Sequence, residues 1–221
     1  MDIDVHVASI NEPLGDDVRI LARVEYATAR GIHRGRDRRA HTAGRSVVRR
    51  RLSIEYGLPA ADVPLRVDPR RRPPSPIPPC FSIAHAGELV VVAVARCAVG
   101  VDVEPLAAVE DDDVLIDLYA SWSERMALRS LPRPERDAAF LKAWVRKEVV
   151  LKAIGVGITG DLTRLDSRLG FESDARRWQV ETLPELPPGY VAAVAVESAT
   201  ESALNIVVHP ALFAALDEVG S

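Results

Sequence analysis

The sequence has few cysteines and no long hydrophobic run. Its two cysteines, Cys80 and Cys97, form no disulfide-framework pattern and have no histidines at metal-ligand spacing, so we expect reduced thiols in a cytoplasmic protein. The longest apolar run, residues 89–95, is far too short to span a bilayer, and residues 1–10 include acidic side chains instead of a signal-peptide pattern. We therefore predict a cytoplasmic protein that does not cross a membrane.

Lysine is also scarce. Lysine and arginine together number 28, yet the only lysines are Lys142, Lys147 and Lys152, all within one short segment. A compact ammonium group differs from the planar fork of arginine, so this cluster indicates a place where a point charge is needed. Chance clustering of a rare residue is the alternative.

Positive charge is concentrated in residues 19–72, which contain 15 Arg and 5 Asp or Glu in a chain whose net charge is −4. Such a segment indicates a polyanionic partner or a solvated arginine-rich helix face. The segment has few aromatic residues beyond Tyr26 and Tyr56, and it contains no recognised nucleic-acid module. A small phosphate-rich ligand fits the segment equally well. We expect no nucleic acid, with a nucleic-acid-associated protein that uses residues 19–72 as an alternative.

The pattern of apolar and turn residues predicts alternating helices and short strands. Helices are predicted over residues 37–56, from 110 to 119 and over about 133–154, with glycines ending the first and last of them. Strands are predicted over residues 81–84, 89–95, 99–104, 178–183, 190–196 and 204–208. A proline-rich connector from 69 to 79 and a proline at 105 separate these elements.

The order of elements in the first half is repeated in the second. Residues 87–95 resemble residues 189–196, each a glycine followed by a run of valine and alanine. We predict an α+β fold with a pseudo-twofold duplication of two similar helix-plus-antiparallel-sheet halves, 1–105 and 106–221. A ligand cleft at the seam follows from this arrangement, and the internal duplication is consistent with a monomer.

Two acidic residues alternate with valines in the segment from Gly100 to Glu104. In a strand, Asp102 and Glu104 would point to one face, with Cα atoms about 6–7 Å apart. Paired carboxylates facing a phosphate ligand are a usual way to hold Mg²⁺. An amphipathic edge strand with two solvated acids is the alternative.

A second group of polar residues lies on the helix predicted over residues 133–154. Trp144, Glu148 and Lys152 are spaced i, i+4, i+8, so one helix face presents an aromatic ring, an acid and a base. Glu148 could supply a third acid for a metal, and Lys152 a ligand for a phosphate. A surface pair between Glu148 and Lys152 is the alternative.

In order and spacing these two segments resemble the Sfp-type 4′-phosphopantetheinyl transferases. That family is marked by a Gly-Ile/Val-Asp-x-Glu strand and, some tens of residues later, by Trp-x-x-Lys-Glu-x-x-x-Lys on a helix. Here the matching segments are 100–104 and 144–152, followed by the family's Ala-x-Gly-x-Gly tail at 153–157. Residues 37–49 and 123–140 also resemble the family, so the resemblance covers roughly residues 25–160.

The resemblance implies a holo-carrier-protein synthase of secondary metabolism. Such an enzyme moves 4′-phosphopantetheine from coenzyme A to a serine of an acyl or peptidyl carrier protein, depends on Mg²⁺ and releases 3′,5′-ADP. The metal ligands would be Asp102, Glu104 and Glu148, and Lys152 would contact the coenzyme pyrophosphate as a catalytic residue. Glu148, or a water that it orients, would take the proton of the carrier serine.

The resemblance also implies further coenzyme-binding residues. His85 stands where the family has a phosphate-contacting histidine flanked by hydroxyl residues, but here its neighbours are Ala84 and Ala86, so Ala84 could bind only through its backbone. Arg72 stands at the basic position of a Gly-Lys/Arg-Pro element, although Arg71 replaces the glycine. An upstream basic position falls on Thr28, which leaves Arg30 or Arg34 to substitute.

The altered residues around the histidine motivate an alternative function. The chain would then be a coenzyme-A-binding module without transfer activity. The sequence does not distinguish carriers of fatty-acid, polyketide or peptide assembly, and it does not identify the surface that would bind them.

Overall fold

The secondary structure comes from a computed structural model, which describes residues 1–11, 18–65, 79–155, 162–167, 171–173, 176–184, 186–197 and 203–210. The helices are α1 (Arg23–Gly31), α2 (Gly35–Tyr56), α3 (Asp112–Tyr119), α4 (Trp122–Arg129) and α5 (Arg133–Ile154), with 3-10 turns η1 (Ala60–Asp62) and η3 (Leu162–Arg164). The strands are β1 (Asp2–Ser9), β2 (Cys80–Ala86), β3 (Leu89–Ala95), β4 (Val99–Pro105), β5 (Phe171–Ser173), β6 (Arg176–Thr182), β7 (Tyr190–Glu197) and β8 (Asn205–Pro210).

The strands form two four-stranded sheets, ordered β2-β3-β1-β8 and β4-β7-β6-β5. All neighbouring strands are antiparallel except β1 and β8, which run parallel. Each sheet contains the same unit, a strand, a long helix and a hairpin: β1, α2, β2 and β3 in one, and β4, α5, β6 and β7 in the other. In both sheets the second hairpin strand pairs with the first strand of its unit, which confirms the predicted α+β duplication.

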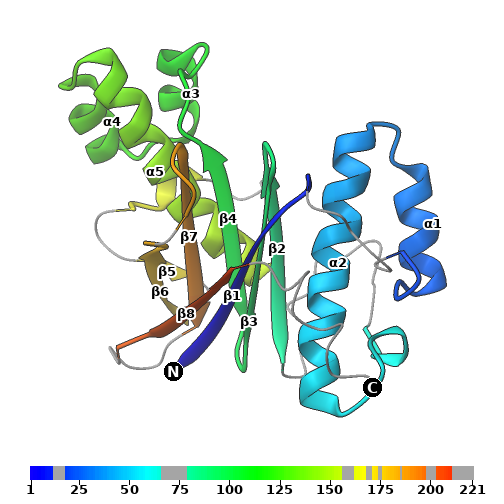
Figure 1. Ribbon diagram of the computed structural model, residues 1–221. Coiled ribbons are helices and arrows are strands. Elements are labelled where there is room, and N and C mark those ends of the chain that lie inside the picture. Colours follow the sequence, from blue (N-terminus) through cyan, green and yellow to red (C-terminus); the bar gives the residue numbers. More distant parts are fainter. Residues whose placement is uncertain are drawn as a thin grey trace.

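The two sheets pack face to face, and a long helix covers the outer face of each (Figure 1). Strand β3 is buried on both sides, since Val91 and Ala93 join the core between the sheets while Val90 and Val92 pack against α2. A strand buried on both faces is expected to have a continuous apolar sequence. This explains why the run at 89–95 shows no polar alternation.

The strand pairing crosses the division that the sequence suggests at residue 105. Strand β4 hydrogen-bonds to β7, so it belongs to the sheet of the second half, and β8 returns to pair with β1 in the first sheet. Each sheet therefore includes a strand from the other half of the chain. The division into 1–105 and 106–221 remains a prediction.

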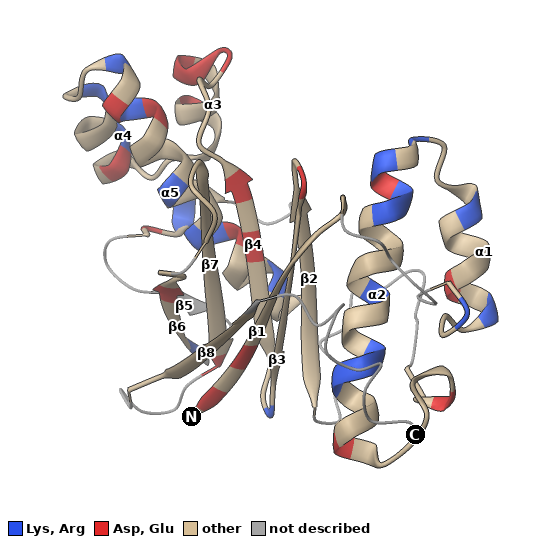
Figure 2. Ribbon diagram, viewed as in Figure 1, with Lys and Arg blue, Asp and Glu red and all other residues tan. Residues whose placement is uncertain are grey.

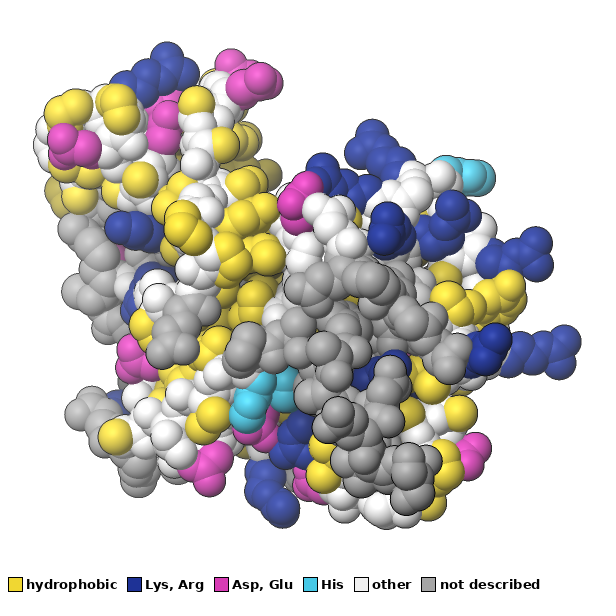
Figure 3. All heavy atoms as spheres, in the orientation of Figure 1, with side chains coloured by type: hydrophobic (Ala, Val, Ile, Leu, Met, Phe, Trp, Pro, Cys, Tyr) yellow, Lys and Arg dark blue, Asp and Glu magenta, His cyan; other side chains and the backbone are white. Residues whose placement is uncertain are grey.

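Basic residues are concentrated on α1 and α2, as Figure 2 shows. In the space-filling view many Lys and Arg side chains project from this side of the molecule (Figure 3). Arg30, Arg34 and Arg38 are exposed, whereas Arg49 is buried. Arg72 lies outside the described residues. None of the helices in the described part of the chain has the length and hydrophobicity that a bilayer crossing requires.

Candidate active site

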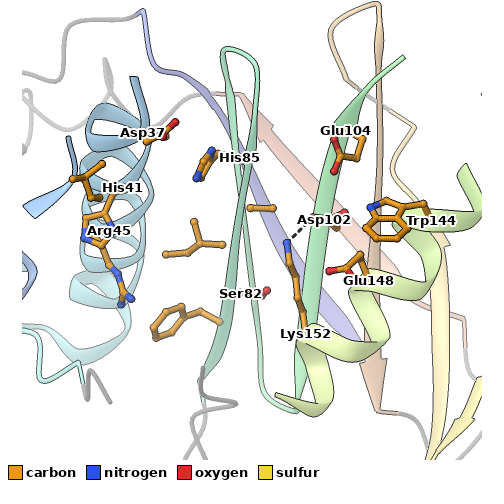
Figure 4. A pocket seen from close by; sticks show the side chains of 15 residues that line it. Asp37, His41, Arg45, Ser82, His85, Asp102, Glu104, Trp144, Glu148 and Lys152 are labelled. Atoms are coloured by element: carbon orange, nitrogen blue, oxygen red, sulfur yellow. Dashed lines mark hydrogen bonds and ion pairs between the residues drawn. The ribbon is translucent and has the colours of Figure 1, made fainter. Parts of the chain in front are cut away.

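A cavity of about 720 Å³ lies between α2 and α5, with strands β2 and β4 at its base (Figure 4). These two strands are edges of different sheets, and they are not joined in a common ladder. The backbone N–H of Val101 instead donates to the hydroxyl of Ser82 at 3.1 Å, which links β4 to β2. The cavity therefore lies at the seam between the two sheets, where the duplication predicts a cleft.

Strand β4 separates its apolar and acidic side chains onto opposite faces. Val101 and Val103 are buried in the core between the sheets, while Asp102 and Glu104 line the cavity. Asp102 is buried and Glu104 is half-buried. The two acids thus share one face, as the strand geometry predicts, and they are not the solvated pair of the alternative interpretation.

Gly100 allows α5 to pack directly on β4. A Cβ atom on Gly100 would lie 2.7 Å from the backbone nitrogen of Ala153 and would overlap the carbonyl oxygen of Val149. Only a residue without a side chain permits this approach of the two backbones. The glycine of the first motif therefore brings the acids of β4 close to the polar face of α5.

Helix α5 presents Trp144, Glu148 and Lys152 to the cavity, one turn apart (Figure 4). Lys152 Nζ lies 2.5 Å from Asp102 Oδ1, so the lysine forms an ion pair with β4. Both side chains are largely buried, with exposures of 14% for Lys152 and 9% for Asp102. Lys152 therefore pairs with Asp102 across the site. The alternative from the sequence, a surface pair of Lys152 with Glu148, did not include this ion pair.

The three acids repel one another. Burial raises the pKa of Glu104, the charges of Asp102 and Glu148 raise it further, and Lys152 and a hydrogen bond with Trp144 lower it. Asp102 Oδ2 is shielded from solvent and has no hydrogen-bond partner in the described part of the chain. Three carboxylates and one ammonium leave a negative charge whose oxygen donors suit a hard divalent cation.

The described residues do not, however, form a ready-made metal site. Nowhere in the ranges that the structure describes do three or more His, Cys, Asp or Glu side chains gather closely enough to hold a metal ion. In the cavity, the Lys152 ammonium lies against Asp102 Oδ1. The donor chemistry fits Mg²⁺, and the ligand set Asp102, Glu104 and Glu148 remains a prediction.

The remaining predicted coenzyme residues are not all at the cavity. Ala84 and His85 on β2 line it, with Ala84 buried and His85 exposed. Arg30 is exposed near the end of α1 and is not among the residues that line the cavity. Arg72 falls outside the described residues, so its predicted role stays a prediction.

Sequence reasoning missed the wall that α2 contributes. Asp37, His41 and Arg45 line the cavity opposite α5 (Figure 4). Their spacing of i, i+4, i+8 is the same as that of the polar residues on α5, the helix at the equivalent position of the duplication. This repeated spacing was the available signal.

The three lysines of α5 have different environments. Lys142 is exposed, Lys152 lines the cavity, and Lys147 points to the opposite side of the helix and is buried. Lys147 Nζ lies 2.5 Å from Glu124 and donates to the carbonyl oxygens of Tyr119 at 2.8 Å and Leu162 at 3.0 Å. The three lysines that cluster in the sequence therefore do not act together at one site.

Comparison with protein families matches residues 98–201 to the 4′-phosphopantetheinyl transferase superfamily. The chain is 28% identical to 4′-phosphopantetheinyl transferase psf-1 of Bacillus pumilus, over 63% of this chain and 60% of that protein. It is 30% identical to 4′-phosphopantetheinyl transferase HetI of Nostoc sp., over 66% of this chain and 64% of that protein. It is 25% identical to 4′-phosphopantetheinyl transferase gsp of Aneurinibacillus migulanus, over 71% of this chain and 63% of that protein.

The matched region spans 60–64% of the length of these relatives. Among solved structures, the holo-[acyl-carrier-protein] synthase of Thermotoga maritima is similar over 46% of this chain and 62% of that one, with 19% identity and a TM-score of 0.34. The family match at 98–201 includes both motifs, the acidic strand β4 and the Trp144–Lys152 face of α5. The resemblance predicted from the sequence is therefore confirmed, and the similarity is to the 4′-phosphopantetheinyl transferase superfamily.

Proposed function

We propose that the chain is a holo-carrier-protein synthase that transfers 4′-phosphopantetheine from coenzyme A to a serine of an acyl or peptidyl carrier protein. The observation that supports this most strongly is the convergence of Asp102, Glu104, Glu148 and Lys152 on one cavity. The relatives named as 4′-phosphopantetheinyl transferases support the same reaction. The partners of the reaction would be coenzyme A and a carrier protein, and the enzyme would work as a cytoplasmic monomer.

Lys152 would bind the pyrophosphate of the coenzyme. Its ammonium reaches the cavity from the last turn of α5, and a pyrophosphate has more negative charge than the single Asp102 carboxylate that now pairs with it. Exchange of one anionic partner for another keeps the buried ammonium neutralised throughout binding. Phosphoryl transfer depends mainly on positioning and charge stabilisation, which is the role we assign to Lys152.

Asp102, Glu104 and Glu148 would hold Mg²⁺, which would neutralise charge on the pyrophosphate. Their all-oxygen donor set suits this ion. Burial raises the pKa of Glu104 most, and repulsion by Asp102 and Glu148 raises it further, which makes it costly to keep three carboxylates together without a cation. Binding of a cation would remove the repulsion among the three carboxylates, so they would favour a divalent ion.

Glu148 would act as the general base. In the reaction, the carrier serine oxygen forms a bond to the β-phosphorus while the bond from that phosphorus to the leaving 3′,5′-ADP breaks. The serine proton passes to the Glu148 carboxylate, which lies in the cavity on the rigid frame of α5. A water oriented by Glu148 could take the proton in its place.

From its position on β2, the His85 side chain would contact a phosphate of the coenzyme. Ala84 would contact the coenzyme only through its backbone. This weaker lining motivates the second candidate, a coenzyme-A-binding module without transfer activity, because alanines flank His85 where the family has hydroxyl residues. Arg30 and Arg72 would approach the nucleotide end only if their segments reach the cavity. The two candidates differ in whether a carrier protein becomes modified.

The decisive experiment combines the protein with coenzyme A, Mg²⁺ and unmodified carrier proteins of fatty-acid, polyketide and peptide pathways. Mass spectrometry would then detect a carrier that gains one phosphopantetheine arm. We expect the gain for at least one carrier and no gain when Mg²⁺ is chelated. Coenzyme A binding without modification of any carrier would instead favour the binding-module candidate.

A further inference from the structure

Strand β8 is held at the edge of the first sheet by a single neighbour. It pairs in parallel with β1, and no strand in the described part of the chain pairs with its other edge (Figure 1). The order β2-β3-β1-β8 puts β8 at the edge opposite β2, the strand that lines the cavity. Separation of β8 from β1 would therefore leave the strands of the cavity in place.

Two histidines meet where β8 pairs with β1. His6 on β1 and His209 on β8 are partners in the strand register, and their rings stack with centroids 4.7 Å apart and planes 18° apart. His6 is only 3% exposed, whereas His209 is partly exposed. On its other side His6 pairs with Val92 of β3, a strand whose side chains are all apolar. His6 thus lies between an apolar strand and a second imidazole ring.

The charged groups around the two rings are paired with one another. Asp4 Oδ2, on β1, accepts hydrogen bonds from Arg51 of α2 at 2.6 and 3.0 Å. Asp4 Oδ1 lies 3.2 Å from His209 Nε2. Arg51 also lies 3.5 Å from Glu55 of α2, which pairs in turn with Arg96 of the β3–β4 turn at 3.5 Å. Both carboxylates of this network are therefore already engaged with other partners.

His6 takes no part in this network. Both of its ring nitrogens are shielded from solvent, and neither has a hydrogen-bond partner among the residues that the structure describes. The pKa of His6 is lowered to about 4, mainly by burial, with further lowering by the charges of His209 and Arg51 and an opposing effect of Asp4. A proton on His6 would create a buried cation beside an imidazole and a guanidinium, without a carboxylate of its own. The folded chain therefore keeps His6 neutral.

Strand β8 is the neighbour of His6 that can leave at the lowest cost. Strand β1 has hydrogen-bonded partners on both sides, whereas β8 has only its ladder to β1. A hydrogen bond from Asn205 to Asp2 at 3.0 Å is exposed, and the apolar residues Ile206 and Val208 are only partly buried. Elements with few buried contacts open locally at a lower free energy than the whole fold. Departure of β8 would remove the His209 ring and admit water to His6.

We infer that the stacked rings of His6 and His209 form an acid-sensitive latch, which holds β8 on β1 near neutral pH and releases it when His6 takes up a proton. Release leaves one edge of β1 unpaired and uncovers the adjoining part of the core between the sheets. The latch is independent of the proposed transfer reaction, because it lies at the sheet edge opposite the cavity.

The expected size of the effect follows from proton linkage. With β8 released, His6 has the ordinary histidine pKa of about 6.5, whereas its pKa is about 4 with β8 in place. The open form therefore binds the proton more tightly, and opening becomes more favourable as the pH falls from 6.5 to 4. The opening constant should rise about 20-fold from pH 7 to pH 5 and about 100-fold from pH 7 to pH 4.

Hydrogen–deuterium exchange tests the latch. Protection factors, corrected for the intrinsic pH dependence of exchange, are measured for β8 and β7 from pH 7 to pH 4, with and without a low concentration of urea. We expect protection of β8 to fall about 100-fold over this range. Urea should change it little, because a local opening exposes little surface. Strand β7 has partners on both sides and should exchange only through an opening that urea strongly promotes.

Two variants identify the group that titrates. His6→Phe keeps a ring against His209 but cannot bind a proton, so protection of β8 should stay nearly constant from pH 7 to pH 4. His6→Leu should give the same result without a ring. His33→Gln, at an exposed position, is the control and should keep the wild-type pH dependence.

Three outcomes would overturn the latch. The first is a wild-type β8 whose protection does not change with pH, and the second is a pH dependence that survives in both His6 variants. The third is equal protection and equal urea dependence of β8 and β7, since β8 would then open only with the whole fold. The comparison of β8 with β7 in the wild-type chain needs no variant, so it decides the question even where a His6 variant does not fold.

Discussion

Lys152 Nζ lies 2.5 Å from Asp102 Oδ1, which pairs the cation proposed for the pyrophosphate with a carboxylate proposed for Mg²⁺. Each of the two groups therefore blocks the other. A pyrophosphate that attracts Lys152 would release Asp102, and a cation that attracts Asp102 would release Lys152. We expect coenzyme A and Mg²⁺ each to strengthen the binding of the other, by the reciprocity of linked equilibria.

Lys152→Gln tests this coupling. Removal of the ammonium eliminates the competitor at Asp102, so Mg²⁺ alone should bind more tightly, whereas coenzyme A should bind about tenfold more weakly because a charge-assisted contact is lost. Titration calorimetry with each ligand separately measures both effects. Lys142→Gln, at an exposed position of the same helix, should change neither affinity. Weaker Mg²⁺ binding in Lys152→Gln would contradict the coupling.

Glu148→Gln tests the general base. The amide cannot accept the serine proton, so turnover should fall by about 10²- to 10⁴-fold while the affinity for coenzyme A changes little. Single-turnover rates of carrier modification and calorimetric affinities separate the two quantities. Equal losses in turnover and affinity would indicate that Glu148 acts only in ligand binding.

Gly100→Ala tests the close packing of β4 against α5. The added methyl group would overlap the backbone of α5, so the free energy of unfolding should fall by about 2 kcal/mol or more and the acids should separate from Lys152. Denaturant unfolding measures the change. Gly35→Ala is the control, because a Cβ atom there meets nothing within 4 Å. Equal stability of the two variants would be evidence against close packing.

Lys147 and Glu124 form a buried ion pair behind the site, each with 2% side-chain exposure. Lys147→Met should cost about 3–5 kcal/mol of stability, because it leaves the Glu124 carboxylate buried without its cation. The double variant Lys147→Met with Glu124→Leu should be less destabilised than the sum of the single variants. Urea unfolding of all four chains gives the coupling energy, and simple additivity would show that the pair contributes nothing as a pair.

His6 should make stability depend on pH. Burial lowers its pKa to about 4, with a further lowering by His209 and Arg51 and an opposing effect of Asp4. The unfolded chain therefore binds a proton below about pH 6.5 that the folded chain does not bind, so stability should fall between pH 6.5 and 4. His6→Phe keeps a ring against His209 and should flatten this profile by about 2–3 kcal/mol.

Denaturant unfolding at several pH values measures the profile of each chain. His33→Gln, at an exposed position, should keep the wild-type dependence. A wild-type stability that stays constant from pH 6.5 to 4 would contradict burial of a neutral His6.

The sequence predicted the central elements closely. Strand β3 and helix α5 have the boundaries expected from their apolar runs and flanking turns, and α5 ends at Gly155 in the left-handed conformation typical of a helix cap. The alternation in β4 also placed Asp102 and Glu104 on one face. These features depend on local patterns with a period of two or of 3.6 residues, which a single sequence reveals directly.

Some elements were missed. Strand β1 was not predicted, although Ile3, Val5 and Val7 alternate with polar residues, a pattern that is visible in the sequence. Helices α1 and α4 were also not predicted, and their apolar residues are mixed with charges that tertiary pairing neutralises. Glu25 on α1 is an example, since it is buried against Arg49 of α2. Likewise, no local pattern indicated that Lys147 is buried in an ion pair with Glu124 of α4.

The exchange of β4 and β8 between the two halves has a consequence for folding. The first sheet is not complete until Asn205–Pro210 reaches β1, and β4 leaves the first half to pair with a strand that begins at Tyr190. Strand pairings over such sequence distances form slowly, because the chain loses the entropy of loop closure before the strand contacts stabilise it. Although its two units are similar in structure, the molecule should fold as one cooperative body, and a fragment ending at residue 105 should expose unpaired strand edges and aggregate.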